Sequence, residues 1–181
     1  MPNLNQIAKR VRECKKCRLW KTRKNTVPGE GPSDAKLFLI GEAPGDNENK
    51  TGRPFIGQSG RVLSKIMEEA KIDRNKVFIS SILKCRPPKN RRPKEDEIKS
   101  CLPYLEGQIK IVKPELIGLL GLVAIKSTIG DHRKLKDMHG QVIRRGNNNY
   151  FLTYHPAAAR RFKKFKLVML QDFKKLKGMI K

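Results

Sequence analysis

The sequence predicts an α/β protein: a three-layer α/β/α fold with a central, mainly parallel four-stranded sheet. Short apolar runs that are typical of buried strands alternate with longer stretches in which apolar residues recur at helical spacing. Such alternation favours a parallel sheet that is covered by helices on both faces. At 181 residues the chain suits one domain with a substantial core, so we expect a single domain over residues 1–181.

The expected strands are short and bounded by turn residues. The first covers residues 37–40, and the second, rich in β-branched residues, lies within 76–83. A third apolar run covers 115–120. Two further runs, 141–144 and 150–153, flank a Gly-Asn-Asn-Asn turn and predict a hairpin.

Five segments are expected to be helical. They are a short N-terminal helix over 4–20 that is interrupted at 14–17, a helix that begins near Arg61, one over 94–112, one over 122–129 that ends at Gly130, and a closing helix with an apolar stripe of Phe165, Met169, Phe173, Leu176 and Ile180. Residues 21–35 are expected to form a loop. Residues 85–93 suit neither a helix nor a central strand, because their prolines lack the amide donors that both structures need.

Net charge is the strongest signal in the composition. Forty-one Lys and Arg residues against 17 Asp and Glu residues give a formal charge of +24, which predicts a polyanionic partner. Nucleic acid is favoured over an anionic membrane, since no run approaches the roughly 20 apolar residues of a spanning helix and no signal-peptide core follows the N-terminus. We therefore expect an intracellular, cytoplasmic protein, and a monomer because no interface is recognisable.

The cysteines form a pattern of their own: a C-x2-C pair, a long gap, and two more separated by 15 residues. They are Cys14, Cys17, Cys85 and Cys101. Disulfides are not expected in an intracellular protein, so ligation of one metal centre by four thiolates is the better interpretation. Zinc and a [4Fe–4S] cluster both accept four thiolates, and spacing does not separate them. We expect a structural staple without an open catalytic position.

The stretch from Lys36 to Gly60 carries the features of a ligand site. A short apolar strand leads into Gly41-Glu42-Ala43-Pro44-Gly45, then into acidic and amide residues, and then into Gly52-Arg53-Pro54-Phe55. Glycine and proline at this density allow the backbone to turn sharply and to approach a ligand closely. In open α/β sheets, ligands bind at the carboxyl ends of strands. An ordinary strand-to-helix loop is the alternative.

Several motifs together resemble the family 4 uracil-DNA glycosylases. Residues 41–45 with Glu48, followed by 52–57, resemble the first motif of that family. Residues 84–91 resemble its proline-rich segment, and His155-Pro156-Ala157-Ala158 resembles its second active-site motif. The cysteines also fall where the [4Fe–4S] ligands of the family lie, so the resemblance favours a cluster over zinc.

The resemblance implies a uracil-DNA glycosylase-like fold and excision of uracil from DNA, with an abasic site as product. Uracil must first be flipped out of the duplex. Phe55 would stack on the flipped base, and His155 would donate a hydrogen bond to uracil O2 as negative charge develops there. Glu42, with Asp46 or Glu48 as lesser candidates, would orient water or stabilise the sugar cation, unless these carboxylates only organise the loop. The implied substrate-binding residues are Gly41, Ala43, Glu48, Phe55 and Ser81.

Basic residues around the motifs are expected to contact DNA phosphates. The principal candidates are Arg86, Arg91, Arg160 and Arg161, with Arg53, Lys84, Arg92, Lys163 and Lys164 as further members of the footprint.

The sequence departs from the family pattern in two places. Ser81 stands where the family has an Asn whose amide reads the uracil edge, and a hydroxyl does not hold both groups of that edge at fixed polarity. Ala159, Arg160 and Arg161 stand where the family commonly has leucines that fill the gap left by the flipped base. We therefore expect a preference for single-stranded or mispaired substrates. The departures also leave open a glycosylase for another deaminated or mismatched base, or a non-catalytic nucleic-acid-binding protein.

Overall fold

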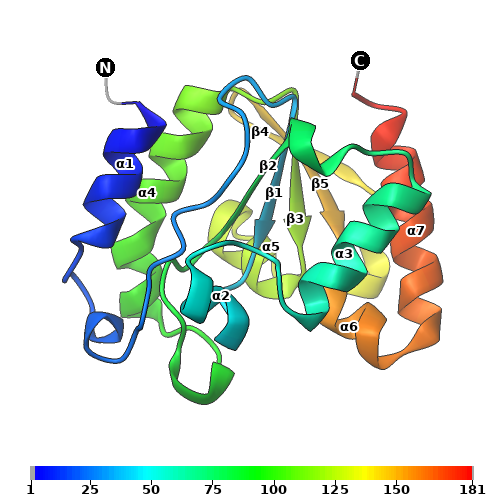
Figure 1. The fold of residues 1–181 in the computed structure, drawn as a ribbon. Coiled ribbons are helices and arrows are strands. Elements are labelled where there is room, and N and C mark those ends of the chain that lie inside the picture. Colours follow the sequence, from blue (N-terminus) through cyan, green and yellow to red (C-terminus); the bar gives the residue numbers. More distant parts are fainter. Residues whose placement is uncertain (1–2, 181) are drawn as a thin grey trace.

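A computed structural model describes residues 3–180 and contains one mainly parallel sheet between two helical layers (Figure 1). The strand order is β2-β1-β3-β5-β4, and β4 alone runs antiparallel to its neighbour. The strands are β1 (Leu37–Gly41), β2 (Val77–Ser81), β3 (Leu116–Leu120), β4 (Val142–Arg145) and β5 (Asn148–Thr153). The fold class is therefore confirmed, but the expected count of four strands is wrong, because the predicted hairpin adds both of its strands to the sheet.

Seven α-helices surround the sheet in the part of the chain that is described. They are α1 (Leu4–Arg12), α2 (Asp46–Thr51), α3 (Gln58–Glu69), α4 (Glu95–Val112), α5 (Leu122–Ile129), α6 (Pro156–Arg161) and α7 (Lys163–Lys177). Short 3-10 turns cover Arg18–Lys21, Arg74–Lys76, Pro88–Asn90 and Leu135–Asp137. None of the helices between residues 3 and 180 combines the length and the apolar character that crossing a membrane requires.

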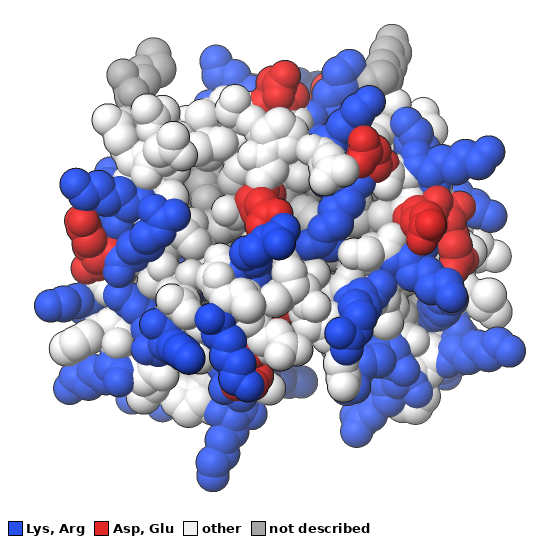
Figure 2. All heavy atoms as spheres, in the orientation of Figure 1, with Lys and Arg blue, Asp and Glu red and all other residues white. Residues whose placement is uncertain are grey.

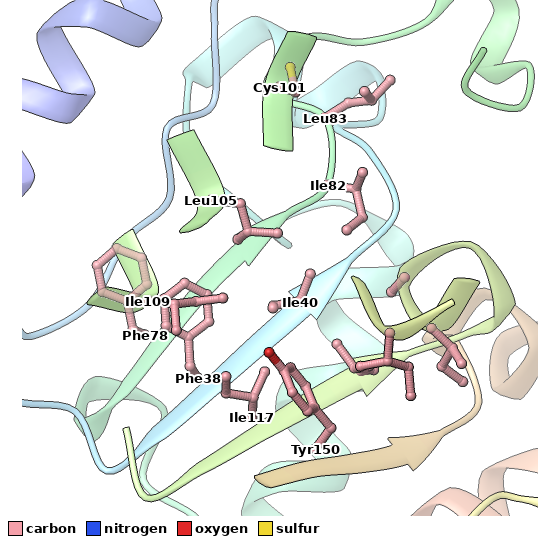
Figure 3. Close-up of a cluster of buried hydrophobic side chains, with 14 of the residues drawn as sticks. Phe38, Ile40, Phe78, Ile82, Leu83, Cys101, Leu105, Ile109, Ile117 and Tyr150 are labelled. Carbon is pink, nitrogen blue, oxygen red and sulfur yellow. The ribbon is translucent and has the colours of Figure 1, made fainter. Parts of the chain in front are cut away.

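The interior strand β1 shows why the fold has three layers. All five of its residues are buried, and successive side chains point to opposite faces of the sheet. Phe38 and Ile40 join a core with α4 and α5 (Figure 3), whereas Leu37 and Leu39 pack under α3 and α7. A strand that is buried on both faces is apolar at nearly every position.

Three local expectations need correction. The N-terminal helix ends at Arg12, well before Trp20, and the chain then turns through the Cys14–Cys17 segment into a separate 3-10 turn. Residues 46–51 were expected to be loop but form α2, a short polar helix whose start is capped by its own Glu48. The stripe residue Ile180 lies beyond the end of α7.

Candidate active site

A pocket of about 340 Å³ opens beyond the carboxyl ends of the parallel strands, where α2 and α6 lie in Figure 1. It gathers most of the residues that the motifs predict. Its walls are Val27, Glu42, Ala43, Pro44, Gly45, Glu48, Pro54, Phe55, Ser59, Ser81, Pro87, Asn90, Arg91, His155, Ala157 and Arg160. A larger hollow of about 790 Å³ lies beside α1. The buried amide of Gln108 in its lining is already hydrogen-bonded to Pro28 and Lys84, so this amide is not free to bind a ligand.

Phe55 occupies its place in the wall only because two glycines make room for it. A Cβ at Gly41, the last residue of β1, would lie 2.4 Å from Cζ of Phe55. A Cβ at Gly60 would lie 1.9 Å from the Phe55 carbonyl oxygen. Phe55 itself has φ = 50°, a left-handed conformation that is uncommon for a bulky residue and costs on the order of 1–3 kcal/mol. Gly41 was predicted to bind substrate, but it is not among the residues that line the pocket, and its lack of a side chain instead admits the ring of Phe55.

The backbone around Phe55 is held by a residue that the motifs do not include. Arg74, half-buried in the 3-10 turn before β2, donates from Nη2 to the carbonyl oxygens of Pro54 (2.9 Å) and Phe55 (3.1 Å). Its Nη1 donates to Ser64 Oγ at 3.0 Å. Sequence reasoning missed Arg74, because nothing at that position distinguishes it from the many surface cations of the chain.

Glu48 serves the loop itself. Its Oε1 accepts hydrogen bonds from the backbone N–H groups of Ile56 (3.0 Å) and Gly57 (2.8 Å), and its Oε2 accepts one from Gly45 at 3.1 Å. A carboxylate that is engaged by three backbone donors tethers both ends of the loop between β1 and α3. The geometry therefore favours a loop-organising role for Glu48 over its expected contact with substrate.

His155 stands on the opposite wall, between β5 and α6. Its Nδ1 accepts the backbone N–H of Ala157 at 3.1 Å, which leaves the proton of a neutral imidazole on Nε2. Part of the ring is open to the pocket, yet the protein around it desolvates the imidazole and lowers the pKa of His155 to about 4. The ring centroids of Phe55 and His155 are 5.9 Å apart, with 38° between the ring planes. The site thus offers a neutral N–H donor beside an aromatic face.

Glu42 and Ser81 complete the polar part of the pocket. Burial raises the pKa of the Glu42 carboxyl, and the positive charge of Arg92 opposes that shift. Ser81, the last residue of β2, pairs with Gly41 in the sheet and is only 5% exposed, so its short side chain reaches only part of the pocket. Ala43 also lines the pocket and offers no side-chain polar group.

The predicted DNA-contacting arginines differ in how far they are already engaged. Arg91 forms a bidentate ion pair with buried Glu97, at 2.6 and 2.9 Å. Arg86 pairs with Asp46 at 2.6 Å, and Arg160 is hydrogen-bonded to Gln58. Arg161 is exposed. These contacts hold the proline-rich loop and α6 at the pocket rim while leaving charge at the surface.

Lys84 does not belong to this footprint, contrary to expectation. It is only 1% exposed, and its Nζ donates to Ser80 Oγ, the Ser81 carbonyl oxygen and Gln108 Oε1 at 2.5–2.9 Å. Burial lowers the pKa of Lys84 to about 7. An ammonium enclosed in this way cannot reach a phosphate; it holds the end of β2 against α4.

All four cysteines line one small cavity between the N-terminal segment, the proline-rich loop and α4. Cys85 and Cys101 are buried, and desolvation raises the pKa of both thiols, that of Cys101 to about 11. Arg23 donates from Nη1 to Cys85 Sγ at 3.3 Å. Four soft donors that converge on one cavity, with a cation at their edge, fit a thiolate-ligated metal centre. Between residues 3 and 180, however, no three His, Cys, Asp or Glu side chains are arranged to hold a single metal ion.

Comparison with known proteins identifies the same family as the motifs. The uracil DNA glycosylase superfamily model matches residues 28–176. The type-4 uracil-DNA glycosylase of Saccharolobus solfataricus is 44% identical over 188 residues, which cover 98% of this chain and 86% of that protein. The type-4 enzyme of Sulfurisphaera tokodaii is 40% identical, and the alignment covers 99% of this chain and 86% of that protein. That of Thermotoga maritima is 36% identical, and the alignment covers 97% of this chain and 93% of that protein. The chain therefore belongs to the type-4 uracil-DNA glycosylases of the uracil DNA glycosylase superfamily.

Proposed function

We propose that this protein excises uracil from DNA by hydrolysing the N-glycosidic bond, which leaves an abasic site for base-excision repair. One observation carries the proposal: an aromatic ring and a neutral imidazole donor, Phe55 and His155, share one pocket with ring centroids 5.9 Å apart. Close relatives that bear the name of this activity support it. The same proposal assigns the protein to the interior of the cell, where its DNA substrate lies.

Binding begins with extrusion of the nucleotide. A base within a duplex is inaccessible, so the uracil must leave the stack at a cost of a few kcal/mol. Stacking on Phe55 offsets roughly 1–3 kcal/mol of that cost. The left-handed backbone of Phe55 and the hydrogen bonds from Arg74 to the carbonyl oxygens of Pro54 and Phe55 fix the ring before substrate arrives, so little ordering is required on binding.

Bond cleavage then depends on charge at the departing base. As the glycosidic bond breaks, its electron pair moves to the base and negative charge grows on uracil O2. His155 donates from Nε2–H to that oxygen, and its low pKa keeps the imidazole neutral at physiological pH, as a hydrogen-bond donor without a net charge. One such preorganised donor contributes about 3 kcal/mol. Glu42 also lines the pocket, and in this proposal its carboxylate orients water or stabilises the cationic sugar.

We further propose that the four cysteines hold a [4Fe–4S] cluster, which ties the N-terminal segment to the walls of the pocket. A single zinc ion requires all four sulfurs within about 2.3 Å of one point. The four thiols line one cavity, and the resemblance of their positions to the cluster ligands of the family favours a [4Fe–4S] cluster over zinc. When bound, the cluster supplies structural cross-linking and no bond-breaking step. Chelation by Cys14, Cys17, Cys85 and Cys101 would also overcome the raised pKa values of the last three thiols.

The proposed substrates are single-stranded DNA and mispaired duplexes. Ala159 stands where the family commonly has a leucine. It is 6% exposed and packs in the core beneath α6. It therefore cannot fill the gap left in a base stack. Substrates that need less unstacking should be favoured for that reason.

The decisive experiment is an alkaline-cleavage assay on uracil-containing oligonucleotides with the wild type and His155→Ala. We expect excision by the wild type and a loss of about 10²- to 10³-fold in the variant. Comparison of single-stranded, U·G and U·A substrates tests the strand preference, and a marked preference for U·A contradicts it. Because Ser81 leaves base selection open, hypoxanthine-containing and T·G oligonucleotides belong in the same assay. A protein that binds all of them without cleavage is a binding protein, which contradicts the proposal.

A further inference from the structure

An exposed aromatic side chain lies just outside the pocket, in the turn between α6 and α7. Phe162 is 50% exposed, although the chain buries most of its large apolar side chains. It is held from one side by the edge of Phe165, with ring centroids 6.0 Å apart and 77° between their planes. A ring that is half-exposed and supported by a neighbouring aromatic side chain is suited to stack on another flat group.

The charge around Phe162 indicates what that group is. Arg160 and Arg161 precede it, Lys163 and Lys164 follow it, and all four are exposed. Figure 2 shows that Lys and Arg far outnumber Asp and Glu on this face of the molecule, the lower edge included. An aromatic side chain among cations on a protein of net charge +24 matches the sites that hold single-stranded nucleic acid, where cations follow the phosphates and rings stack on bases.

The position of Phe162 after α6 gives its approximate distance from His155, the residue that contacts the extruded base in the proposed function. His155 caps the start of α6 and Phe162 follows its last residue, so Phe162 lies seven positions after His155 in the chain. At 1.5 Å per residue, Phe162 lies about 10 Å along the helix from His155, or roughly three stacked nucleotides at 3.4 Å each. Arg160, in between, lines the pocket itself. A DNA strand that leaves the pocket along α6 passes Arg160 and then meets Phe162.

We propose that Phe162 is a stacking platform for an unpaired base of the substrate strand, one to three nucleotides from the extruded uracil. This inference rests on the proposed function and extends it with a second base-binding subsite. The ligand class is a nucleobase of any identity, because every base has a stacking face. The platform favours single-stranded substrates, since a base that is already paired is not free to stack on the protein.

Binding to single-stranded DNA with and without the ring tests this subsite. The probe is a labelled single-stranded oligonucleotide with one 2′-fluorinated, cleavage-resistant deoxyuridine, and the variants are Phe162→Ala and Phe162→Trp. We expect Phe162→Ala to weaken binding by at least about fivefold and Phe162→Trp to retain it. Leu167→Ala is the matched control, because Leu167 is equally exposed (56%) on the next helix but lies outside the cationic turn. Its affinity should equal that of the wild type.

Salt dependence and a base-specific fluorophore separate stacking from phosphate binding. Phe162→Ala should leave the slope of affinity against salt unchanged, whereas Arg161→Ala should make it shallower by about one counterion. A 2-aminopurine placed one, two or three nucleotides from the uracil should be quenched at one of these positions by the wild type and not by Phe162→Ala. Equal affinity and equal quenching for the two proteins overturn the subsite. If the wild type excises uracil in that case, the proposed function stands without it.

Discussion

The guanidinium of Arg74 donates hydrogen bonds to the carbonyl oxygens of Pro54 and Phe55, 20 and 19 residues earlier in the chain. These bonds fix the backbone at the point where Phe55 adopts φ = 50°. Burial lowers the pKa of Arg74, yet an arginine remains charged at any physiological pH, so both bonds are charge-assisted. Arg74 is therefore a positioning residue: it acts on the base only through the ring of Phe55.

Replacement of Arg74 by Met should release that ring. Removal of hydrogen bonds from a charged donor costs about 1.5–3 kcal/mol of stability. Misplacement of Phe55 by about 1 Å would lower kcat/KM by up to about 10²-fold. Unfolding curves and excision kinetics measure the two effects, with exposed Arg61→Met on α3 as the control. Arg74 has no positioning role if the variant loses stability but keeps wild-type kcat/KM below its melting temperature.

His155 predicts an unusual pH dependence of activity. An ordinary histidine titrates near pH 6.5, but the pKa of His155 is about 4 in the folded protein. The neutral donor form therefore persists as pH falls from 8 to 5, and kcat should show no loss attributable to this residue until the pH approaches 4. Measurement of excision across pH 4–8 checks this expectation. A fall in kcat centred near pH 6.5 that is absent from His155→Gln would contradict it.

The same shift makes His155 a pH-dependent contributor to stability. Between pH 6.5 and 4 the unfolded chain binds a proton at this residue and the folded protein does not. The unfolding free energy therefore falls as pH decreases through that window, and the contribution is fully regained above pH 6.5. His155→Gln should remove this part of the pH dependence. Denaturation curves of the two proteins at pH 7 and pH 5 would show a difference in unfolding free energy that narrows or reverses at the lower pH.

Ser81 predicts a gain of function. Its hydroxyl sits at the end of β2 in the pocket wall, where a longer amide would present a donor and an acceptor together. Ser81→Asn should raise uracil excision, or its selectivity over cytosine, by about two- to tenfold, the worth of one net hydrogen bond. Ser59→Asn, which adds an amide elsewhere on the same wall, is the control. Unchanged or poorer excision by Ser81→Asn would show that the serine is already adequate.

The main strands and helices of this protein could be predicted from the sequence alone. The apolar run that became β1 and the periodic segments that became α3 and α4 predict buried elements through hydrophobic pattern, which depends on local spacing. His155 and Phe55 were identified from their motifs, and the structure brings them into one pocket although 100 residues separate them. The hairpin was also foreseen, but not that both of its strands join the sheet.

What the sequence did not reveal depends on contacts between distant segments. Arg74 and Lys84 look like two more cations in a strongly basic chain, yet one holds the Phe55 backbone and the other is enclosed between β2 and α4. The polar helix α2 has no hydrophobic periodicity, and the contacts of Glu48 with Gly45, Ile56 and Gly57 appear only once the loop is folded. Partners in space, not composition, decide the role of each of these residues.

The cysteine cavity predicts how the protein responds to loss of its metal centre. Cys101→Ser leaves three thiols in the cavity, of which only that of Cys85 is buried, and burial raises the pKa of this thiol and so keeps it protonated in the absence of metal. We expect the variant to lose bound iron and sulfide, its brown colour and its broad visible absorbance band, and to melt at a lower temperature. Elemental analysis and a thermal melt measure both effects, with the neighbouring Ser100→Ala on α4 as the control. A colourless wild-type protein that carries one zinc ion would contradict the cluster and show a mononuclear site in its place.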